Sequence, residues 1–254
     1  MSRLFILSAF TFITACQLND EKIRLTKSDE SITPYKTTSD IEPPAGYKRM
    51  KLTDDSFGAW LRKIAVKKDK HVYLYNGALK DNQSAQFVVL DIPVGTKDLQ
   101  QCADAVMRLR AEYLFAQKKY DDIEFRDNDG KAYKWTGGND RPGFERYLEK
   151  VFNWCGSASL EKQLKKVPAL KDMQAGDVFI KGGFPGHAMI IIDVATNDKG
   201  NKMFMLAQSY MPAQDIHIVK NPMDDKLSPW YDIEDMKQVI TPQWEFSTDQ
   251  LRRW

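Results

Sequence analysis

Three residues that lie far apart in the sequence have the types that a thiol-based nucleophilic site requires. Cys102 stands in the segment DLQQCADAVMRLRAEYL, His187 in GGFPGHAMIII and Gln208 in MLAQSY. In such a site an imidazole takes the proton of the thiol and later returns it to the leaving group, while a third polar residue orients the ring. The partners meet only in the folded chain. The pattern predicts Cys102 as nucleophile, His187 as general base and Gln208 as orienting residue.

The residues around Cys102 predict a helix that would activate its thiol. Apolar residues recur at helical spacing on one face, namely Leu99, Cys102, Val106, Leu109 and Tyr113. Asp98 is the expected N-cap, and Gln101 is placed to complete a capping box. A thiol in the first turn of a helix feels the positive end of the macrodipole, which lowers its pKa. We therefore expect a reactive Cys102.

Two other interpretations of Cys102 stay open at this stage. Because it falls on the apolar face of its helix, it could be an inert core residue. It could also pair with Cys155, since lipidation of Cys16 would leave an even pair of cysteines in an exported protein.

The polar turn sequence ATNDKGNK, between two β-branched and apolar runs, predicts a hairpin that brings His187 to Gln208. A turn centred near residues 198–199 places His187 opposite Ser209 and Tyr210, with Gln208 one or two residues away. An amide at that distance can fix the tautomer of the imidazole. His217 alternates with two isoleucines and is expected to face solvent or a groove. Gln101, Ser209, Tyr210 and His217 are the predicted binding residues of this groove.

The elements that must position these residues follow a mixed order. Helical patterns occur in FGAWLRKI, the Cys102 segment, FERYLEKVFNWC and LEKQLKK, and the strand patterns HVYLY and AQFVVLDIPV stand between the first two of them. The second half turns to strands, in DVFI, HAMIIIDVA, MFMLAQSY and DIHIVK. This order predicts an α+β fold with helices packed on an antiparallel sheet.

The N-terminus has the pattern of an export signal. One positive charge, Arg3, precedes an apolar run over residues 4–15, which is too short to span a membrane and ends in Thr14-Ala15-Cys16. This ending resembles the bacterial lipobox, which implies lipidation of Cys16 and attachment to a membrane. Residues 16–42 are therefore expected to comprise the lipidated Cys16 and, because the residues after it are polar, a flexible spacer. Residues 43–254 are predicted to form a single domain.

Composition and missing motifs exclude several classes of function. The chain has 37 basic and 35 acidic residues, and the loss of Arg3 with the signal leaves a net charge of +1. Without a run of Lys and Arg, nucleic acid is not an expected partner. The three histidines and two remaining cysteines have no zinc-ligand spacing, and phosphate and dinucleotide loops are missing. We expect no metal and no cofactor.

The cysteine at a helix start and the segment QAGDVFIKGGFPGHAMIIIDVA resemble the bacterial cell-wall branch of the papain-like thiol hydrolases, the NlpC-like and CHAP domains. The resemblance implies a papain-like α+β fold, with Cys102 as nucleophile, His187 as base and Gln208 as orienting residue. The chain departs from that family at the nucleophile, where the usual D-C-S/G-x-F/L reads QQCADAV.

A second resemblance covers nearly the whole mature chain. The segments DLQQCADAVMRLRAEYL, PGHAMIIIDVA, LAQSYMPAQDIHIVKNP and SPWY are similar to a family of bacterial lipoproteins known only as a domain of unknown function. It implies no chemistry. One hypothesis is a lipid-anchored hydrolase of the bacterial cell envelope, periplasmic or at the cell surface, that cleaves amide bonds such as those of peptidoglycan peptides. The other is a non-catalytic envelope lipoprotein that binds a peptide or glycan.

Overall fold

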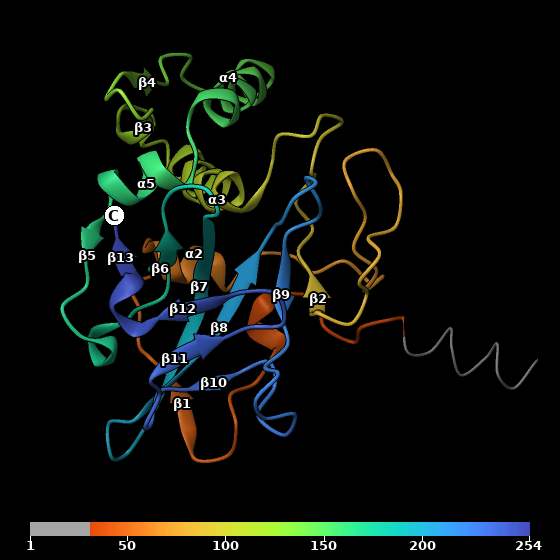
Figure 1. Cartoon of the computed structure of the whole chain (residues 1–254), viewed down its shortest axis with the longest axis vertical. Helices are drawn as coiled ribbons and strands as arrows, with labels where there is room; N and C mark the ends of the chain where they lie inside the picture. The colour runs from red at the N-terminus through yellow and green to blue at the C-terminus, as the bar shows by residue number, and fades with distance from the viewer. Residues whose placement is uncertain (1–30) are drawn as a thin grey trace, which may run out of the picture.

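The computed structural model describes residues 31–254 (Figure 1). Its helices are α2 (Phe57–Leu61), α3 (Cys102–Ala116), α4 (Arg141–Trp154) and α5 (Ser157–Gln163), with 3-10 turns η1 (Thr38–Asp40), η2 (Tyr120–Asp122), η3 (Leu170–Asp172) and η4 (Thr248–Gln250). Its strands are β1 (Tyr47–Arg49), β2 (Gln86–Val89), β3 (Glu124–Arg126), β4 (Ala132–Lys134), β5 (Lys165–Lys166), β6 (Val178–Lys181), β7 (His187–Asn197), β8 (Lys202–Gln208), β9 (His217–Val219), β10 (Tyr231–Asp232), β11 (Gln238–Ile240), β12 (Glu245–Ser247) and β13 (Leu251–Arg253). Helices and one large antiparallel sheet confirm the predicted α+β class.

The large sheet has the order β2-β9-β8-β7-β6-β13-β5, with β1 added to β7 and β10 added to β8. The hairpin β7–β8 lies at its centre and is the longest pair of strands in the described chain. In Figure 1, α3, α4 and α5 gather with the β3–β4 ribbon at one end of the molecule, while β1 and β10 lie at the opposite end. The segment HVYLY, expected to be a strand, forms only isolated bridges through Tyr73 and Leu74.

The register of β7 and β8 confirms the hairpin that the turn residues predict. Ile190 pairs with Ala207 and Ile191 with Leu206, which is the register expected at the His187 end of the strand. A bulge before Asp193 shifts the pairing by one residue nearer the turn. His187 is therefore the first residue of β7, and it faces the end of β8.

Both faces of this sheet are covered, which explains why β7 is buried from His187 to Ala195 rather than alternating. Residues such as Ile190 and Ile192 belong to the core shared with α3, whose long and small side chains favour a helix. Met189 and Ile191 point into a second core with Phe246 of β12. Because α3 packs on β7 and β8, the start of the helix and the start of β7 meet at one end of the central strands.

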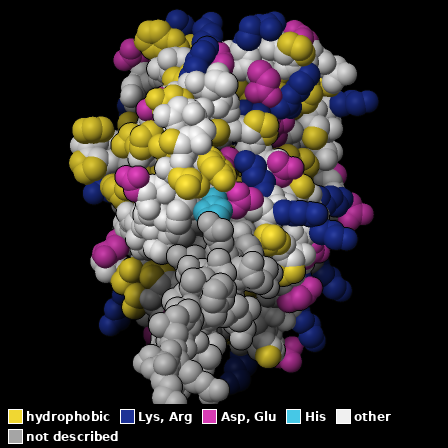
Figure 2. All heavy atoms as spheres, turned by 90° about the vertical axis from the view of Figure 1, so that its right-hand side faces the viewer, with side chains coloured by type: hydrophobic (Ala, Val, Ile, Leu, Met, Phe, Trp, Pro, Cys, Tyr) yellow, Lys and Arg dark blue, Asp and Glu magenta, His cyan; other side chains and the backbone are white. Residues whose placement is uncertain are grey.

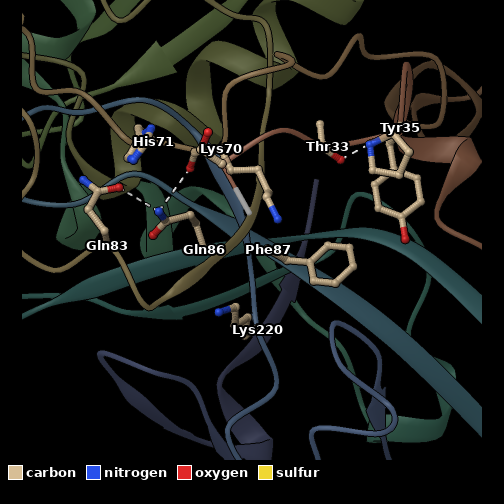
Figure 3. Close-up of a pocket in the computed structure, with 10 residues that line it drawn as sticks. Thr33, Tyr35, Lys70, His71, Gln83, Gln86, Phe87 and Lys220 are labelled. Atoms are coloured by element: carbon tan, nitrogen blue, oxygen red, sulfur yellow. Dashed lines mark hydrogen bonds between the residues drawn. The ribbon is translucent and has the colours of Figure 1, made fainter. Parts of the chain in front are cut away.

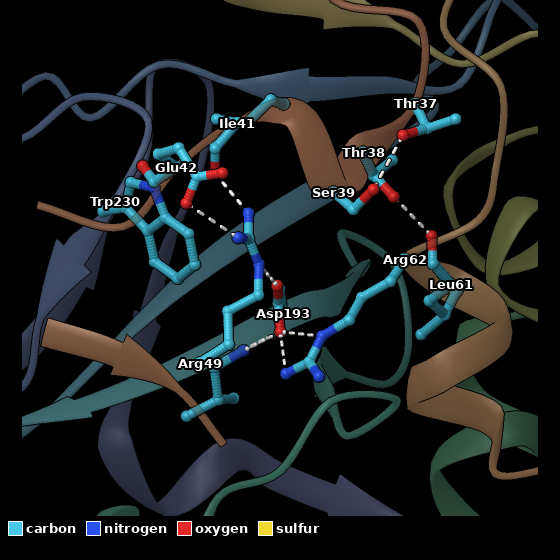
Figure 4. A network of polar contacts seen from close by, with 11 residues as sticks. Thr37, Thr38, Ser39, Ile41, Glu42, Arg49, Leu61, Arg62, Asp193 and Trp230 are labelled. Carbon is cyan, nitrogen blue, oxygen red and sulfur yellow. Dashed lines mark hydrogen bonds and ion pairs between the residues drawn. The ribbon is translucent and has the colours of Figure 1, made fainter. Parts of the chain in front are cut away.

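A cluster of charged side chains ties the N-terminal segment to β7 (Figure 4). The carboxylate of Asp193 is buried and forms ion pairs with Arg49 Nε at 2.8 Å and with Arg62 Nη2 at 2.6 Å. Arg49 also donates to the carbonyl oxygen of Ile41 at 2.7 Å, and Trp230 Nε1 donates to that of Glu42 at 2.9 Å. Three separate parts of the chain are therefore joined at this cluster.

Residues 31–42, which the sequence assigned to the spacer, pack against the domain instead. Ile32 bridges Asp69, Thr37 bridges Ala65, and Ile41 is buried in the core. A few apolar residues without a regular spacing in a polar stretch are too weak a signal to reveal this packing from the sequence. Cys16 and the export signal lie outside the described residues. Within residues 31–254, no helix is long and apolar enough to cross a membrane.

Candidate functional site

A pocket of about 420 Å³ lies where the start of α3 meets the start of β7. It is lined by Asp98, Leu99, Gln101, Cys102, Ala103, Asp104, Phe152, Cys155, Gly156, Ser157, Gly183, Phe184, Pro185, Gly186, His187, Tyr210, Met211 and Trp244. The fold therefore brings Cys102 and His187 into one pocket, together with two of the predicted binding residues, Gln101 and Tyr210.

Cys102 is the first residue of α3, one position after the N-cap Gln101 rather than one turn inside the helix. The backbone N–H of Gln101 donates to Asp104 Oδ2 at 3.0 Å, so Gln101 is the N-cap in place of Asp98, and Asp104 completes the capping box in place of Gln101. The backbone N–H groups of Ala188, Ala103 and Cys102 act on the Cys102 sulfur and favour its thiolate. Ala188 directly follows His187, which places the sulfur beside the start of β7.

The pKa of Cys102 shifts in the opposite direction from the one expected. Burial raises the pKa of the thiol to about 11, because desolvation of the thiolate outweighs the favourable backbone N–H groups. The positive end of the helix dipole does favour the thiolate, as expected, but the loss of solvent around the sulfur disfavours it more strongly. In the unliganded protein at neutral pH, Cys102 is therefore a neutral thiol.

His187 is buried and held by its neighbours. Its Nε2 lies 2.8 Å from Gln208 Oε1, and its ring lies 4.9 Å from the Tyr210 ring and 5.2 Å from the Trp244 ring. Burial lowers the pKa of His187 to about 4, so its imidazole is neutral at pH 7. Since Gln208 Oε1 can only accept, Nε2 carries the proton and Nδ1 keeps a lone pair.

Gln208 is itself oriented by a network behind His187. Its Nε2 lies 2.9 Å from Gln243 Oε1 and 3.4 Å from His217 Nε2. His217 Nδ1 in turn donates to the backbone oxygen of Asp215 at 2.9 Å. Lys80 Nζ donates to Gln243 Oε1 at 2.6 Å. Gln208 is therefore held between Gln243 and His187, with its oxygen toward His187.

Two of the four predicted binding residues are not at the pocket. His217 is fully buried in β9 behind Gln208, because both faces of the sheet are covered and alternation no longer marks an exposed face. Ser209 is also fully buried, and its Oγ lies within hydrogen-bond distance of two backbone oxygens, that of Gln100 at 2.8 Å and that of Gln214 at 2.9 Å, either of which can accept its one proton. Ser209 thus joins the end of β8 to the segment before α3.

Cys102 and Cys155 are both free thiols in the described chain, so the disulfide alternative is wrong. Both line the same pocket, Cys102 from α3 and Cys155 just after α4. Burial raises the pKa of Cys155 to about 12. Backbone N–H groups act on the Cys102 sulfur, whereas among the described residues none acts on Cys155, whose surroundings are therefore those of an inert core thiol.

The free thiols lead to a simple expected result. The midpoint of urea unfolding should be the same with and without dithiothreitol, because no crosslink constrains the unfolded chain. Cys102→Ala and Cys155→Ala should each cost about 1–2 kcal/mol independently, the order of a small buried truncation. If reduction instead lowered the free energy of unfolding by about 2–4 kcal/mol, and each variant showed the same loss, the two cysteines would be crosslinked.

The sequence reasoning missed Lys80 and Gln243. Lys80 stands in the turn-like segment GALKDNQ and Gln243 in TPQWEF, and both read as surface residues. The structure buries Lys80 to 7% exposure and inserts Gln243 between it and Gln208. Residues from such distant segments carry no local signal that they meet.

The pocket mouth is apolar and its charges are acidic. Phe184 is 96% exposed and Met211 is 51% exposed, and both lie at the rim. Among the described residues that line the pocket, none is Lys or Arg, whereas Asp98 and Asp104 are present. Asp98 Oδ1 is engaged by the backbone N–H of Ala213 at 2.7 Å. A ligand rich in carboxylates would meet no counter-charge here.

A second hollow, of about 440 Å³, lies away from these residues (Figure 3). It contains the stacked rings of Tyr35 and Phe87, with centroids 5.7 Å apart, and the lysines Lys70 and Lys220. It brings together none of the predicted catalytic residues. Figure 2 shows the face of the molecule at the right of Figure 1, where basic and acidic side chains are interspersed rather than gathered into a stripe of one charge.

Comparisons with known proteins add one match. A family model described as Domain of unknown function (4846) matches residues 37–140 and 134–253, which is most of the chain. No curated protein and no solved structure matches the chain.

Proposed function

Because the chain belongs to the family described as Domain of unknown function (4846), whose description assigns no activity, we propose a function from the site itself. The protein acts as a lipid-anchored thiol hydrolase of the bacterial cell envelope, on a papain-like fold, and cleaves amide bonds such as those of peptidoglycan peptides. The observation that carries this proposal is the shared pocket of Cys102 and His187, with His187 Nε2 held by Gln208 Oε1 at 2.8 Å.

The chemistry follows from the protonation states. With the thiol pKa near 11 and the imidazole pKa near 4, both groups are neutral before substrate binds. The sulfur attacks the substrate carbonyl carbon as its proton moves to His187 Nδ1, the nitrogen that Gln208 leaves unoccupied. The imidazolium then protonates the leaving amine, and water releases the acyl group from Cys102. Backbone N–H groups at the start of α3 stabilise the negative charge that develops.

The lining of the pocket supports a narrower substrate class. Phe184 and Met211 offer an apolar rim, and among the described residues the lining includes no Lys or Arg; its acidic residues are Asp98 and the buried Asp104, whose pKa is raised by burial. The group next to the scissile amide is therefore apolar or cationic, since a carboxylate would be desolvated without a partner.

A second candidate function rests on one observation. The raised pKa of Cys102 is also what a buried, unreactive thiol would have. In that case the same pocket holds a peptide or glycan without cleaving it, and the protein is a non-catalytic envelope lipoprotein.

The test uses the full chain with His187→Ala and Cys102→Ala, and with Cys155→Ala as the matched thiol control. Release of amines from peptidoglycan stem peptides should fall at least about 100-fold in the first two variants, the usual contribution of a general base or nucleophile. Cys155→Ala should stay within about threefold of wild type, because this thiol lies just after α4 and not beside the start of β7, where the backbone of Ala188 acts on Cys102.

A second readout needs no substrate. At pH 7, His187→Ala should slow alkylation of Cys102 by iodoacetamide about tenfold, because the thiol loses its proton acceptor. Full hydrolysis in either variant, or equal alkylation rates in wild type and His187→Ala, contradicts the hydrolase and favours the binding protein.

A further inference from the structure

Lys80 is a buried cation without a counter-charge. Its side chain is 7% exposed, and among the described residues no carboxylate acts on its charge. Its partner is a neutral amide oxygen, Gln243 Oε1, at 2.6 Å. An unpaired ammonium in the interior is costly, and burial lowers the pKa of Lys80 to about 8. An apolar residue of similar length would avoid this cost, so stability alone does not account for lysine at this position.

In the chain of hydrogen bonds from Lys80 through Gln243 and Gln208 to His187, only one assignment of donors and acceptors is consistent. An ammonium group donates and cannot accept, so the atom of Gln243 that faces Lys80 must be its oxygen. The same oxygen accepts from Gln208 Nε2 at 2.9 Å. Gln208 must therefore turn its own oxygen toward His187, 2.8 Å from Nε2. The orientation of each amide thus follows from the charge at the far end.

His217 fits the same scheme. Its Nδ1 donates to the backbone oxygen of Asp215, which leaves Nε2 as an acceptor facing Gln208 Nε2. The titratable groups around the network are His187 on β7, His217 on β9 and, across the His187 ring, Tyr210 and Cys102 at the pocket. The charge of Lys80 opposes protonation of both histidines.

We propose that Lys80 is the positioning residue of the Cys102–His187 site. Through Gln243 and Gln208 it keeps His187 as the Nε2–H tautomer, whose Nδ1 is able to take the thiol proton. Its charge also opposes protonation of the imidazole, in addition to the burial that keeps His187 neutral. The catalytic meaning of this role rests on the proposed hydrolase function, whereas the effect on the tautomer does not.

The first test is the nitrogen NMR spectrum of His187 in the full chain. In wild type, His187 should appear as a single Nε2–H tautomer that titrates near pH 4. In Lys80→Met, Gln243 is no longer held in one direction and only the longer contact to His217, at 3.4 Å, still orients Gln208, so the Nδ1–H tautomer should also appear. The titration should move to higher pH, because a nearby positive charge has been removed.

Two further variants separate charge from orientation. Lys80→Arg keeps the charge and the donor, and should keep the titration near that of wild type. Gln243→Met keeps Lys80 but interrupts the hydrogen bonds, and should lose the single tautomer. Lys202→Met is the matched control, because Lys202 is a partly buried lysine at the opposite end of β8, where its Nζ donates to the backbone oxygen of Met173 at 3.0 Å. It should change neither property.

The outcomes distinguish this proposal from the proposed function. A single Nε2–H tautomer with an unchanged titration in Lys80→Met overturns the positioning role. If the tautomer changes as expected but His187→Ala leaves the alkylation of Cys102 unaffected, the positioning role stands and the hydrolase does not. If both hold, Lys80→Met should also slow that alkylation severalfold at pH 7, and Lys80→Arg should restore most of it.

Discussion

Asp193→Ala is expected to lower the free energy of unfolding by about 3–5 kcal/mol, the usual effect of removing one partner from a buried ion pair. Asp193 forms ion pairs with both Arg49 and Arg62, whose side chains are only 19% and 17% exposed. After the substitution, two poorly hydrated cations lose their counter-charge. The backbone N–H of Val194, which donates to Asp193 Oδ1 at 2.8 Å, also loses its acceptor.

Glu42→Ala provides the matched control, because Glu42 pairs with the same Arg49 at 3.1 Å but is 78% exposed. Its removal should cost less than about 1 kcal/mol, since water screens an exposed pair. Urea unfolding followed by tryptophan fluorescence measures both changes. Equal costs for the two variants would show that the cluster at Asp193 does not hold the N-terminal segment to β7.

The wild-type protein is expected to lose on the order of 5 kcal/mol of unfolding free energy through His187 and His217 as the pH falls from about 6.5 to 4. Burial lowers the pKa of His187 to about 4 and that of His217 to about 3, from an ordinary value of 6.5. Between these values the unfolded chain binds more protons than the folded protein. Stability therefore rises with pH in this window and is lost on acidification.

Asp104 works against this loss. Burial raises the pKa of its carboxyl group well above the usual value, so the folded protein binds a proton there that the unfolded chain releases. Asp104→Asn should therefore make the acid loss steeper. His217→Asn keeps a donor toward the backbone oxygen of Asp215 but does not titrate, and should reduce the slope by about one proton, or 1.4 kcal/mol per pH unit.

Urea unfolding at half-unit steps between pH 7 and 4 measures these slopes. The comparison of His217→Asn with wild type isolates the imidazole, because exposed carboxylates titrate alike in both proteins. If the free energy of unfolding changed with pH in the same way in wild type and in His217→Asn, His217 would be solvated in the folded protein. It would also remove the physical basis for neutral imidazoles behind the pocket.

The sequence by itself determined the features that depend on neighbouring residues. The turn formers after Ala195 set the register of β7 and β8, and so brought His187 to Gln208. The apolar spacing around Cys102 predicted α3, and the order of helical and strand patterns predicted the α+β class. Turn chemistry and hydrophobic periodicity act over a few residues, and they can therefore be read along the chain.

Only the tertiary structure decided the electrostatics of the site. Lys80, Gln243 and Gln208 come from distant segments, and their alignment behind His187 exists only after folding. The dipole at the N-terminus of α3 predicted a lowered pKa for Cys102. The elements that cover the pocket remove water from the thiol, and this desolvation raises its pKa instead. Desolvation depends on everything that packs around a group, whereas the helix dipole depends on the helix alone. For this reason the sequence indicated which residues could react, and the packing determined their protonation states.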